Sequence, residues 1–350
     1  MRKKLLLFLF ILPVIFILLS GCDFPYQDHS APATTGGDFT VYFIDVDQAD
    51  SALVICDGEA MLIDGGNVGD SDLIYTFLTD KNITYLDYVV CTHAHEDHVG
   101  GLSGALNAAA AGTVFCPVDS YDSGAFENFK SAVSKQGLEL TAPAAGSAFT
   151  LGGAEVSILG PLFEYADTNN TSIVLKITYG DTSFLFTGDM ERDAELDLIE
   201  EYGSALSSDV LKTGHHGSVT SSSYVFLYEV SPAYAVISCG KDNSYGHPHE
   251  EVLSRLRDAD VTLFRTDMQG TITCTSDGVN IYFETERNSD AVTNPTETSG
   301  DGAVYIGNVN SKKPHLQTCT SLPEEKNRVI FHSLEEAYAL GYEGCSTCMK

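Results

Sequence analysis

Residues 92–101 read Thr-His-Ala-His-Glu-Asp-His-Val-Gly-Gly and directly follow an apolar run typical of a buried strand. His93 and His95 are two residues apart at the end of this expected strand, so both side chains can point to one place. Asp97 and His98 then turn with the chain toward a second place nearby. Imidazole and carboxylate groups together favour Zn²⁺ or Mn²⁺ in an open, hydrolytic site. The alternative is an accidental histidine-rich loop. Such a loop rarely contains three histidines and an aspartate at this spacing.

Three more polar stretches follow strand-like runs further along the chain. They are Thr-Gly-Asp at 187–189, Leu-Lys-Thr-Gly-His-His-Gly-Ser at 211–218 and Asn-Ser-Tyr-Gly-His-Pro at 243–248. We expect Asp189 to present its carboxylate at the C-terminal end of a strand. Its alternative role is the N-cap of a helix that starts at the next residue. For His247, the alternative is a helix-start residue before the proline.

These stretches resemble the His-x-His-x-Asp-His signature and the later motifs of the metallo-β-lactamase fold superfamily. They resemble most the hydrolase domain of ComEC-type competence proteins, over residues 39–286. The likeness includes Asp-Val-Asp-Gln-Ala-Asp at 45–50, Leu-Ile-Asp-Gly-Gly at 62–66 and Asn-Thr-Ser at 170–172. It implies an α/β fold in which two mixed β-sheets pack between helices, an αββα sandwich, with metals at one sheet edge.

The resemblance also implies two divalent metal ions, Zn or Mn, and a role for each matching residue. The implied metal ligands are His93 and His95 for one ion, Asp97, His98 and His247 for the other, and Asp189 as the bridge. The candidate catalytic residues are Asp97, which would orient the water, and His215 and His216. His215 is interpreted as a general acid or phosphate contact, and a purely structural role is the alternative for His216. Lys212 and Ser218 are candidate contacts to an anionic substrate.

The sequence departs from the family pattern at two places. Asp47 and Ala49 stand where the family has glycines, which predicts an altered first turn. The histidine that completes the first metal site in many superfamily members has no counterpart here, and Asn169 or Asn170 occupies its neighbourhood. A site with one imidazole fewer would bind Zn²⁺ less tightly and favour Mn²⁺ or Mg²⁺.

The beginning of the chain has the features of a bacterial lipoprotein leader. Three basic residues precede an apolar run at 5–19, and Leu-Ser-Gly-Cys follows at 19–22. This pattern predicts a signal peptide over 1–21, lipidation of Cys22 and a tether over 22–38. A plain signal anchor is the alternative. The protein is therefore expected at the outer face of the cytoplasmic membrane.

The end of the chain is expected to form a separate α+β module, residues 303–350, after a linker at 287–302. Its spacing, His315-x3-Cys319-x25-Cys345-x2-Cys348, is typical of a structural zinc site. The surrounding sequence resembles the metal-binding domain of Ada-type DNA repair proteins, although His315 stands where that domain has its first cysteine. A disulfide between Cys319 and Cys345 or Cys348 is the alternative.

Composition limits the functions that remain. The 350 residues carry a net charge of −30, which excludes a polybasic nucleic-acid binder whose affinity comes from Lys and Arg on phosphates. The sequence is interpreted as a lipid-anchored, metal-dependent phosphodiesterase or nuclease acting on DNA or oligonucleotides, with a DNA-uptake permease as candidate partner. The alternatives are a hydrolase of a small ester, lactone or β-lactam, and an inactive surface nucleic-acid-binding protein. Five cysteines in strand-like segments are expected to be buried thiols: Cys56, Cys91, Cys116, Cys239 and Cys274.

Overall fold

The computed structural model describes residues 39–295, 305–316, 319, 321–331, 337–338, 340–343 and 345. The predicted signal peptide, Cys22, the 22–38 tether and Cys348 lie outside the described residues. Within the part of the chain that is described, no helix combines the length and the apolar character needed to cross a membrane.

Two large sheets form the main domain. The first has the strand order β15-β14-β1-β2-β3-β4-β5-β6, and the second has the order β13-β12-β11-β10-β9-β8-β7. The strands of the first sheet are β1 (Phe39–Phe43), β2 (Ala52–Cys56), β3 (Glu59–Ile63), β4 (Tyr85–Val90), β5 (Ala110–Phe115), β6 (Leu140–Thr141), β14 (Ile272–Ser276) and β15 (Ile281–Thr285). Those of the second are β7 (Ala148–Leu151), β8 (Ala154–Gly160), β9 (Val174–Tyr179), β10 (Thr182–Phe186), β11 (Val210–Lys212), β12 (Tyr234–Ile237) and β13 (Thr262–Arg265).

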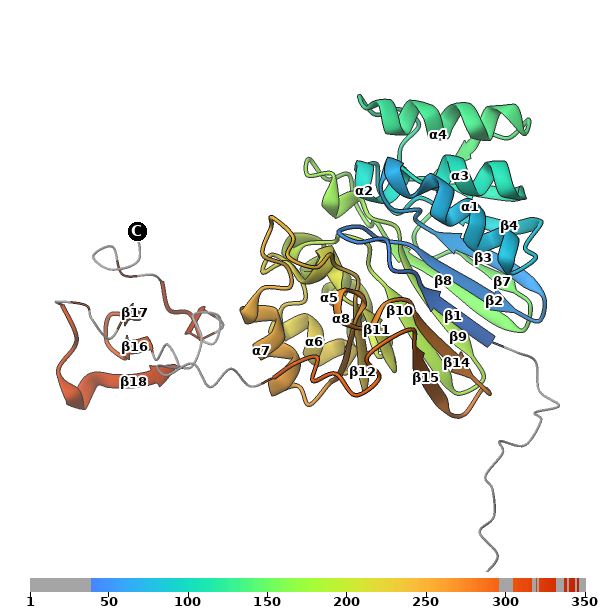
Figure 1. The fold of residues 1–350 in the computed structure, drawn as a ribbon. Coiled ribbons are helices and arrows are strands. Elements are labelled where there is room, and N and C mark those ends of the chain that lie inside the picture. Colours follow the sequence, from blue (N-terminus) through green and yellow to red (C-terminus); the bar gives the residue numbers. More distant parts are fainter. Residues whose placement is uncertain are drawn as a thin grey trace, which may run out of the picture. The chain divides into compact units, whose positions relative to one another are not determined.

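Helices cover the outer face of each sheet, as Figure 1 shows. On the first sheet lie α1 (Ser71–Asp80), α2 (Glu96–Val99), α3 (Leu102–Ala108) and α4 (Gly124–Lys135). With the second sheet lie α5 (Arg192–Tyr202), α6 (Tyr224–Val230), α7 (Glu250–Asp258) and the short α8 (Thr266–Gln269). Single turns of 3₁₀-helix occur at Val68–Asp70, Asn169–Thr171, Gly203–Leu206, Gly214–Gly217 and Glu325–Asn327. The main domain is thus the αββα sandwich that the sequence predicts.

Successive side chains of a strand point to opposite faces of its sheet. The apolar side chains therefore form three core layers, one between the two sheets and one under the helices of each sheet. In β10, Phe184 and Phe186 enter the layer between the two sheets, whereas Leu185 packs under the helices of the second sheet. In β2, Val54 enters the same central layer and Leu53 packs under the helices of the first sheet. Because both faces of each sheet are buried, these strands are nearly continuous apolar runs in the sequence.

Parallel strands bring the polar motifs to one edge of the sandwich. β3, β4 and β5 run parallel in the first sheet, and β10, β11, β12 and β13 run parallel in the second. The loops that follow β4, β10, β11 and β12 therefore leave from strand ends of the same sense. These loops carry residues 92–95, 187–191, 213–223 and 238–249, in which most of the predicted site residues lie.

The C-terminal module has its own small sheet, in the order β17-β16-β18. The strands are β16 (Tyr305–Asn308), β17 (Lys313–Leu316) and β18 (Arg328–Phe331). Phe331, Ala337 and Tyr342 form its buried apolar cluster. Of the predicted linker, residues 287–295 are described, and they pack on the main domain: Arg287 pairs with Asp45 at 2.8 Å.

Candidate metal centre

The loop after β4 is held by one buried carboxylate, Asp64, at the end of β3. Asp64 accepts hydrogen bonds from the Thr92 backbone N–H at 2.7 Å and from the Thr92 hydroxyl at 2.6 Å. It also lies 2.8 Å from His98 Nδ1. Since the carboxylate accepts and His98 Nδ1 donates, His98 Nε2 is the nitrogen that faces the site. A carboxylate behind a histidine in this way fixes ring orientation in metal sites.

Gly100 and Gly101 are required for close approach, not for an unusual backbone bend. Gly100 has a helical φ of −58° and Gly101 a φ of −84°. A Cβ at Gly101 would lie 2.0 Å from the Gly65 carbonyl oxygen, and one at Gly100 would lie 2.3 Å from the Val68 nitrogen. The pair lets the loop that carries the histidines press against the β3 loop that carries Asp64.

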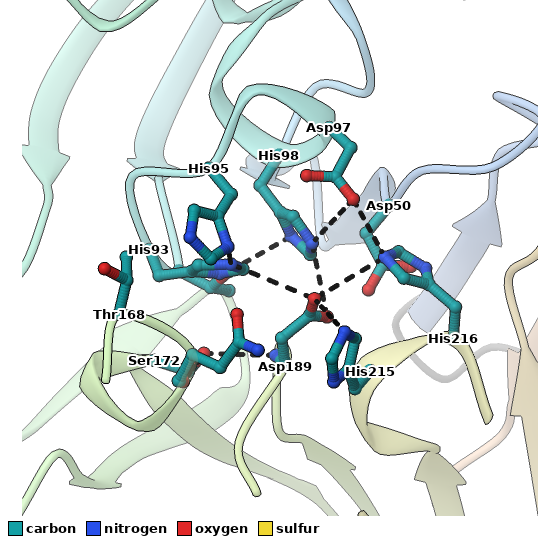
Figure 2. A network of polar contacts seen from close by, with 12 residues as sticks. Asp50, His93, His95, Asp97, His98, Thr168, Ser172, Asp189, His215 and His216 are labelled. Carbon is teal, nitrogen blue, oxygen red and sulfur yellow. Dashed lines mark hydrogen bonds and ion pairs between the residues drawn. The ribbon is translucent and has the colours of Figure 1, made fainter. Parts of the chain in front are cut away.

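Asp189 lies at the centre of the predicted site, and imidazoles surround it (Figure 2). Its Oδ1 lies 3.2 Å from His98 Nε2. Its Oδ2 lies 3.9 Å from His93 Nε2, 3.7 Å from His215 Nε2 and 3.6 Å from His216 Nε2. The alternative role as a helix N-cap is wrong, because α5 begins at Arg192 and its N-cap is Glu191. Asp189 is 2% exposed, so this carboxylate has been placed in the protein interior among nitrogen ligands.

Four ligand atoms gather on one side of Asp189. Single atoms of Asp97, His98, Asp189 and His216 all lie within 4.8 Å of one another. His216 Nε2 is 3.2 Å from Asp97 Oδ2. On the other side, His93 Nε2 lies 3.0 Å from His95 Nδ1. The two groups meet at Asp189, which is the arrangement that two metal ions with a shared carboxylate require.

The charges of this cluster fit a cation. Burial opposes ionisation of Asp189, but His98 and His216 outweigh it and hold the pKa of Asp189 well below its usual range. Burial likewise disfavours a charged His98, yet Asp189 and Asp64 raise its pKa well above the ordinary value. Asp189 Oδ1 nevertheless lacks a hydrogen-bond partner among the described residues. Protons on the histidines thus compensate buried carboxylates, and divalent cations can replace those protons.

His247 does not join this four-atom group, although the resemblance assigns it to the second ion. Its ring lies against that of His216, with centroids 6.3 Å apart, and 5.6 Å from that of His215. Its Nδ1 lies 3.2 Å from Gln48 Nε2. In the structure, His216 occupies the position beside Asp97 and His98, and His247 forms the next layer outward. His249, and not His247, is the N-cap of α7.

His215 and His216 lie in a strained turn after β11. Both have left-handed backbone conformations, with φ of 48° and 52°. This region costs a non-glycine residue about 1–2 kcal/mol. His216 is fixed by Nδ1, which donates to the Ser238 carbonyl at 3.0 Å. His215 Nδ1 lies 3.1 Å from Glu191 Oε1, which Asn169 Nδ2 also contacts at 3.2 Å. This backbone conformation directs both rings into the site.

The residues missed by sequence reasoning are those that hold ligands in place. Asp64 belongs to a motif quoted from the sequence, but its contact with His98 depends on two strands being neighbours. For Glu191, the only indication in the sequence is its position two residues after the Gly-Asp motif. Asn169 and Asn170 line this region as expected: Asn170 Oδ1 accepts from the Glu191 N–H at 2.9 Å, and Asn169 Oδ1 is buried without a hydrogen-bond partner within the described segments.

Lys212 and Ser218 do not contact the site cavity as the sequence suggested. Lys212 is buried and forms an ion pair with Asp50 at 2.8 Å, behind His98. Ser218 is buried too, and its hydroxyl lies 3.0 Å from Thr220 Oγ1. The reason is that alternate residues of β11 face opposite sides, and Lys212 faces the interior between the sheets near Asp50.

The segment that follows the histidine turn contacts two buried side chains, Glu195 and Arg255. Glu195 accepts from the backbone N–H groups of Ser222 and Ser223. Arg255 Nη1 donates to the Ser221 carbonyl at 2.8 Å. Burial raises the pKa of Glu195 to about 7.

A pH-dependent stability follows from Glu195. Its folded pKa is above the unfolded one, so its contribution is complete below pH ~4.5 and is lost as pH rises through ~7. We expect the free energy of unfolding of the wild type to fall by about 3 kcal/mol more than that of Glu195→Gln over this range. Urea unfolding at pH 4.5, 6 and 8 measures this difference. Equal slopes for both proteins would contradict it.

The C-terminal module brings together three of its four predicted ligands. His315, Cys319 and Cys345 are buried, and one ligand atom of each lies within 4.8 Å of the others. His315 Nδ1 is 3.3 Å from Cys319 Sγ. The five cysteines predicted as buried thiols, Cys56, Cys91, Cys116, Cys239 and Cys274, are all buried and outside disulfides.

Known proteins are similar to this chain over more than half of its length. The family profile described as the metallo-beta-lactamase superfamily matches residues 44–241. ComE operon protein 3 of Bacillus subtilis is 33% identical over 207 residues, which are 59% of this chain and 26% of that protein. Competence protein ComA of Neisseria gonorrhoeae is 32% identical over 262 residues, 74% of this chain and 35% of that protein. This chain therefore spans about a quarter to a third of these relatives.

Among solved structures, the metallo-beta-lactamase fold protein YhfI from Bacillus subtilis is similar. The likeness covers 68% of this chain and 100% of that one, at 14% identity and with a TM-score of 0.48.

Proposed function

The chain belongs to the metallo-beta-lactamase superfamily, and from this premise we propose that it is a metal-dependent phosphodiesterase acting on DNA or oligonucleotides. The observation that carries the proposal is the position of Asp189, between the His93–His95 pair and the group of Asp97, His98 and His216. The two curated relatives named above include a competence protein, which favours a nucleic acid over a small ester as substrate.

Five side chains would hold two divalent ions, with a sixth shared between them. His93 and His95 would bind the first ion, Asp97, His98 and His216 would bind the second, and Asp189 would serve both. The first site has Asn169 or Asn170 where many superfamily members have a third histidine, and a site with one imidazole fewer favours Mn²⁺ over Zn²⁺. When bound, such ions lower the pKa of water and stabilise charge on a scissile phosphate.

The remaining side chains would orient and protonate. Asp97 is partly exposed at the cavity, where its carboxylate would accept a hydrogen bond from a water molecule and so orient it. His215 is also partly exposed, and Glu191 at its Nδ1 leaves Nε2 directed into the cavity. His215 would donate a proton from Nε2 to the leaving oxygen. His216 is buried and would serve as a metal ligand. Of the two candidate general acids, this leaves His215.

His247 would take a supporting position in this arrangement. It borders the cavity beside His215 and His216, and its imidazole can contact a phosphate oxygen. The ligand role that the resemblance assigns to it remains a prediction, which metal analysis of His247→Ala can test. Loss of one bound ion would restore His247 as a ligand.

The proposal extends to the two ends of the chain. His315, Cys319, Cys345 and Cys348 would bind one structural Zn²⁺, which a module of this size needs because its apolar core is small. Lipid on Cys22 would hold the enzyme at the outer face of the cytoplasmic membrane, where a DNA-uptake permease is a fitting partner. Weak, salt-sensitive binding of polyanions is expected at the net charge of −30.

A substrate panel tests the reaction class. The protein, with Mn²⁺, Zn²⁺ or Mg²⁺, is given bis(p-nitrophenyl) phosphate, p-nitrophenyl acetate, an acyl homoserine lactone and a chromogenic cephalosporin. We expect turnover of the phosphodiester, and its loss after chelation and return on adding metal. Turnover confined to the ester, lactone or β-lactam would favour the alternative hydrolase, and no turnover with bound metal would favour a binding protein.

A further inference from the structure

The cavity over the metal centre is acidic. It has a volume of about 540 Å³. Its described lining holds four acidic side chains and neither lysine nor arginine: the acids are Asp47, Glu96, Asp97 and Asp189. A phosphodiester that enters this cavity meets no permanently charged cation of the protein in that lining. Beyond the bound metals, its affinity must come from uncharged contacts.

The lining of the adjoining cavity is also more acidic than basic, with Asp45, Asp47, Asp70, Asp242 and Asp267 against Lys241, Arg265 and Arg287. This cavity has a volume of about 820 Å³ and shares Asp47 and His247 with the first. Both arginines are paired, Arg265 with Asp267 at 2.7 Å and Arg287 with Asp45 at 2.8 Å, and Lys241 is the remaining basic residue of this lining. Apart from any bound metal ions, acidic side chains outnumber basic ones in the described lining of the two cavities, so this lining does not attract a polyanion.

One exposed aromatic ring lines the metal cavity. Tyr245 is 67% exposed, which is unusual for a ring beside a buried centre. It is stacked on His247, with the ring centroids 5.6 Å apart and the planes 24° from parallel. One face of Tyr245 is thus covered by an imidazole. The exposed fraction shows that much of the rest of the ring is open to a ligand.

The loop that carries Tyr245 is fixed by the amide of Asn243. Asn243 Oδ1 accepts from the N–H of Tyr245 at 3.1 Å and from that of His247 at 3.0 Å. Its Nδ2 donates to the carbonyls of Gly240, at 2.9 Å, and His247. One side chain therefore satisfies four backbone groups of the turn. The backbone that carries the ring is pre-organised, so a ligand need not order this turn.

We propose that Tyr245 is a specificity-determining residue, on whose open face an unpaired nucleobase next to the scissile phosphate stacks. Stacking on an aromatic ring needs no cation and accepts any base. A base inside a duplex cannot offer its face to a side chain, so the substrate class is single-stranded nucleic acid. The proposal deepens the proposed function and rests on it for the chemistry, whereas the stacking itself is a binding property.

Binding measures the stacking without turnover. Fluorescein-labelled thymidine hexanucleotide with phosphorothioate linkages, and an abasic oligomer with the same backbone, are titrated with Mn²⁺-loaded protein and followed by fluorescence anisotropy. We expect the wild type to prefer the thymidine oligomer by about 5- to 150-fold. Tyr245→Ala should lose this preference, and Tyr245→Phe, which keeps the ring, should retain it. Tyr228→Ala, at a ring 81% exposed on α6, should behave as wild type.

Equal binding of the two oligomers by the wild type would overturn the proposal. So would a base preference that survives in Tyr245→Ala, or the absence of binding to either oligomer. Tighter binding of a matched duplex than of the single strand would also overturn it, since paired bases are not available for stacking.

Kinetics separate this proposal from the proposed function. Thymidine 5′-(p-nitrophenyl phosphate) and methyl p-nitrophenyl phosphate release the same leaving group, but only the first has a base. Tyr245→Ala should raise KM for the thymidine ester with kcat nearly unchanged, and leave the methyl ester unaffected, because a uniform binding contact is lost. A kcat loss on both esters would show a structural role for Tyr245 and contradict the proposal. Base-selective binding without cleavage of either ester would contradict only the proposed function.

Discussion

Asp189→Asn is expected to lower phosphodiesterase kcat/KM by at least about 10³-fold, because both proposed metal positions lose their shared ligand charge. The change removes one negative charge and keeps the size of the side chain, so packing around residue 189 is conserved. The measurement is bis(p-nitrophenyl) phosphate hydrolysis together with the metal content of the purified variant. We expect metal content to fall with activity.

A nearby carboxylate offers the matched control for Asp189. Asp193 lies in the first turn of α5 and is exposed. Asp193→Asn makes the same chemical change four residues away and should leave activity and metal content at wild-type values. If Asp189→Asn kept full activity, the site would not be built around this carboxylate, and the two-metal assignment would fail.

Lys212→Met is expected to destabilise the protein by about 3–5 kcal/mol, because it leaves a buried aspartate without its cation. Lys212 and Asp50 form an ion pair at 2.8 Å, with side chains only 5% and 7% exposed. Asp50 Oδ1 already lacks a hydrogen-bond partner in the described part of the chain. Urea unfolding of the wild type and the variant measures the loss.

A double variant distinguishes charge from packing at this pair. Lys212→Met with Asp50→Asn removes both charges, so it should be more stable than Lys212→Met alone. Lys135→Met, at an exposed position at the end of α4, should change stability by less than about 0.5 kcal/mol. A double variant less stable than the single one would contradict the ion-pair explanation.

Sequence patterns indicate the parts of the fold that have strong periodicity. The strands 184–186 and 234–237 are continuous apolar runs, and α4 and α7 are amphipathic. In β5, Ala110–Phe115, only the end beside Cys116 is strand-like in sequence, because the Ala-Ala-Gly start has little β-branched or aromatic character. Its place in the sheet is set by pairing with β4, a tertiary contact that no local pattern contains.

The candidate site shows the same division between local and long-range information. The residues of 92–101 and Asp189 were identifiable because each follows a strand, and strand ends of parallel sheets meet at one edge. Which histidine lies beside Asp97 was not identifiable in this way. His216 and His247 both follow β-strands, and only the strained turn at His216, with its bond to the Ser238 carbonyl, places it inward.

The central claim is that this buried centre cleaves phosphodiester bonds in nucleic acid with the aid of metal ions. Its most direct test is cleavage of a single-stranded DNA oligonucleotide by the protein in Mn²⁺, followed on a denaturing gel beside the chelated protein. We expect fragments with Mn²⁺, none after chelation, and their return when Mn²⁺ is restored. An intact oligonucleotide in the presence of fully metal-loaded protein would contradict it.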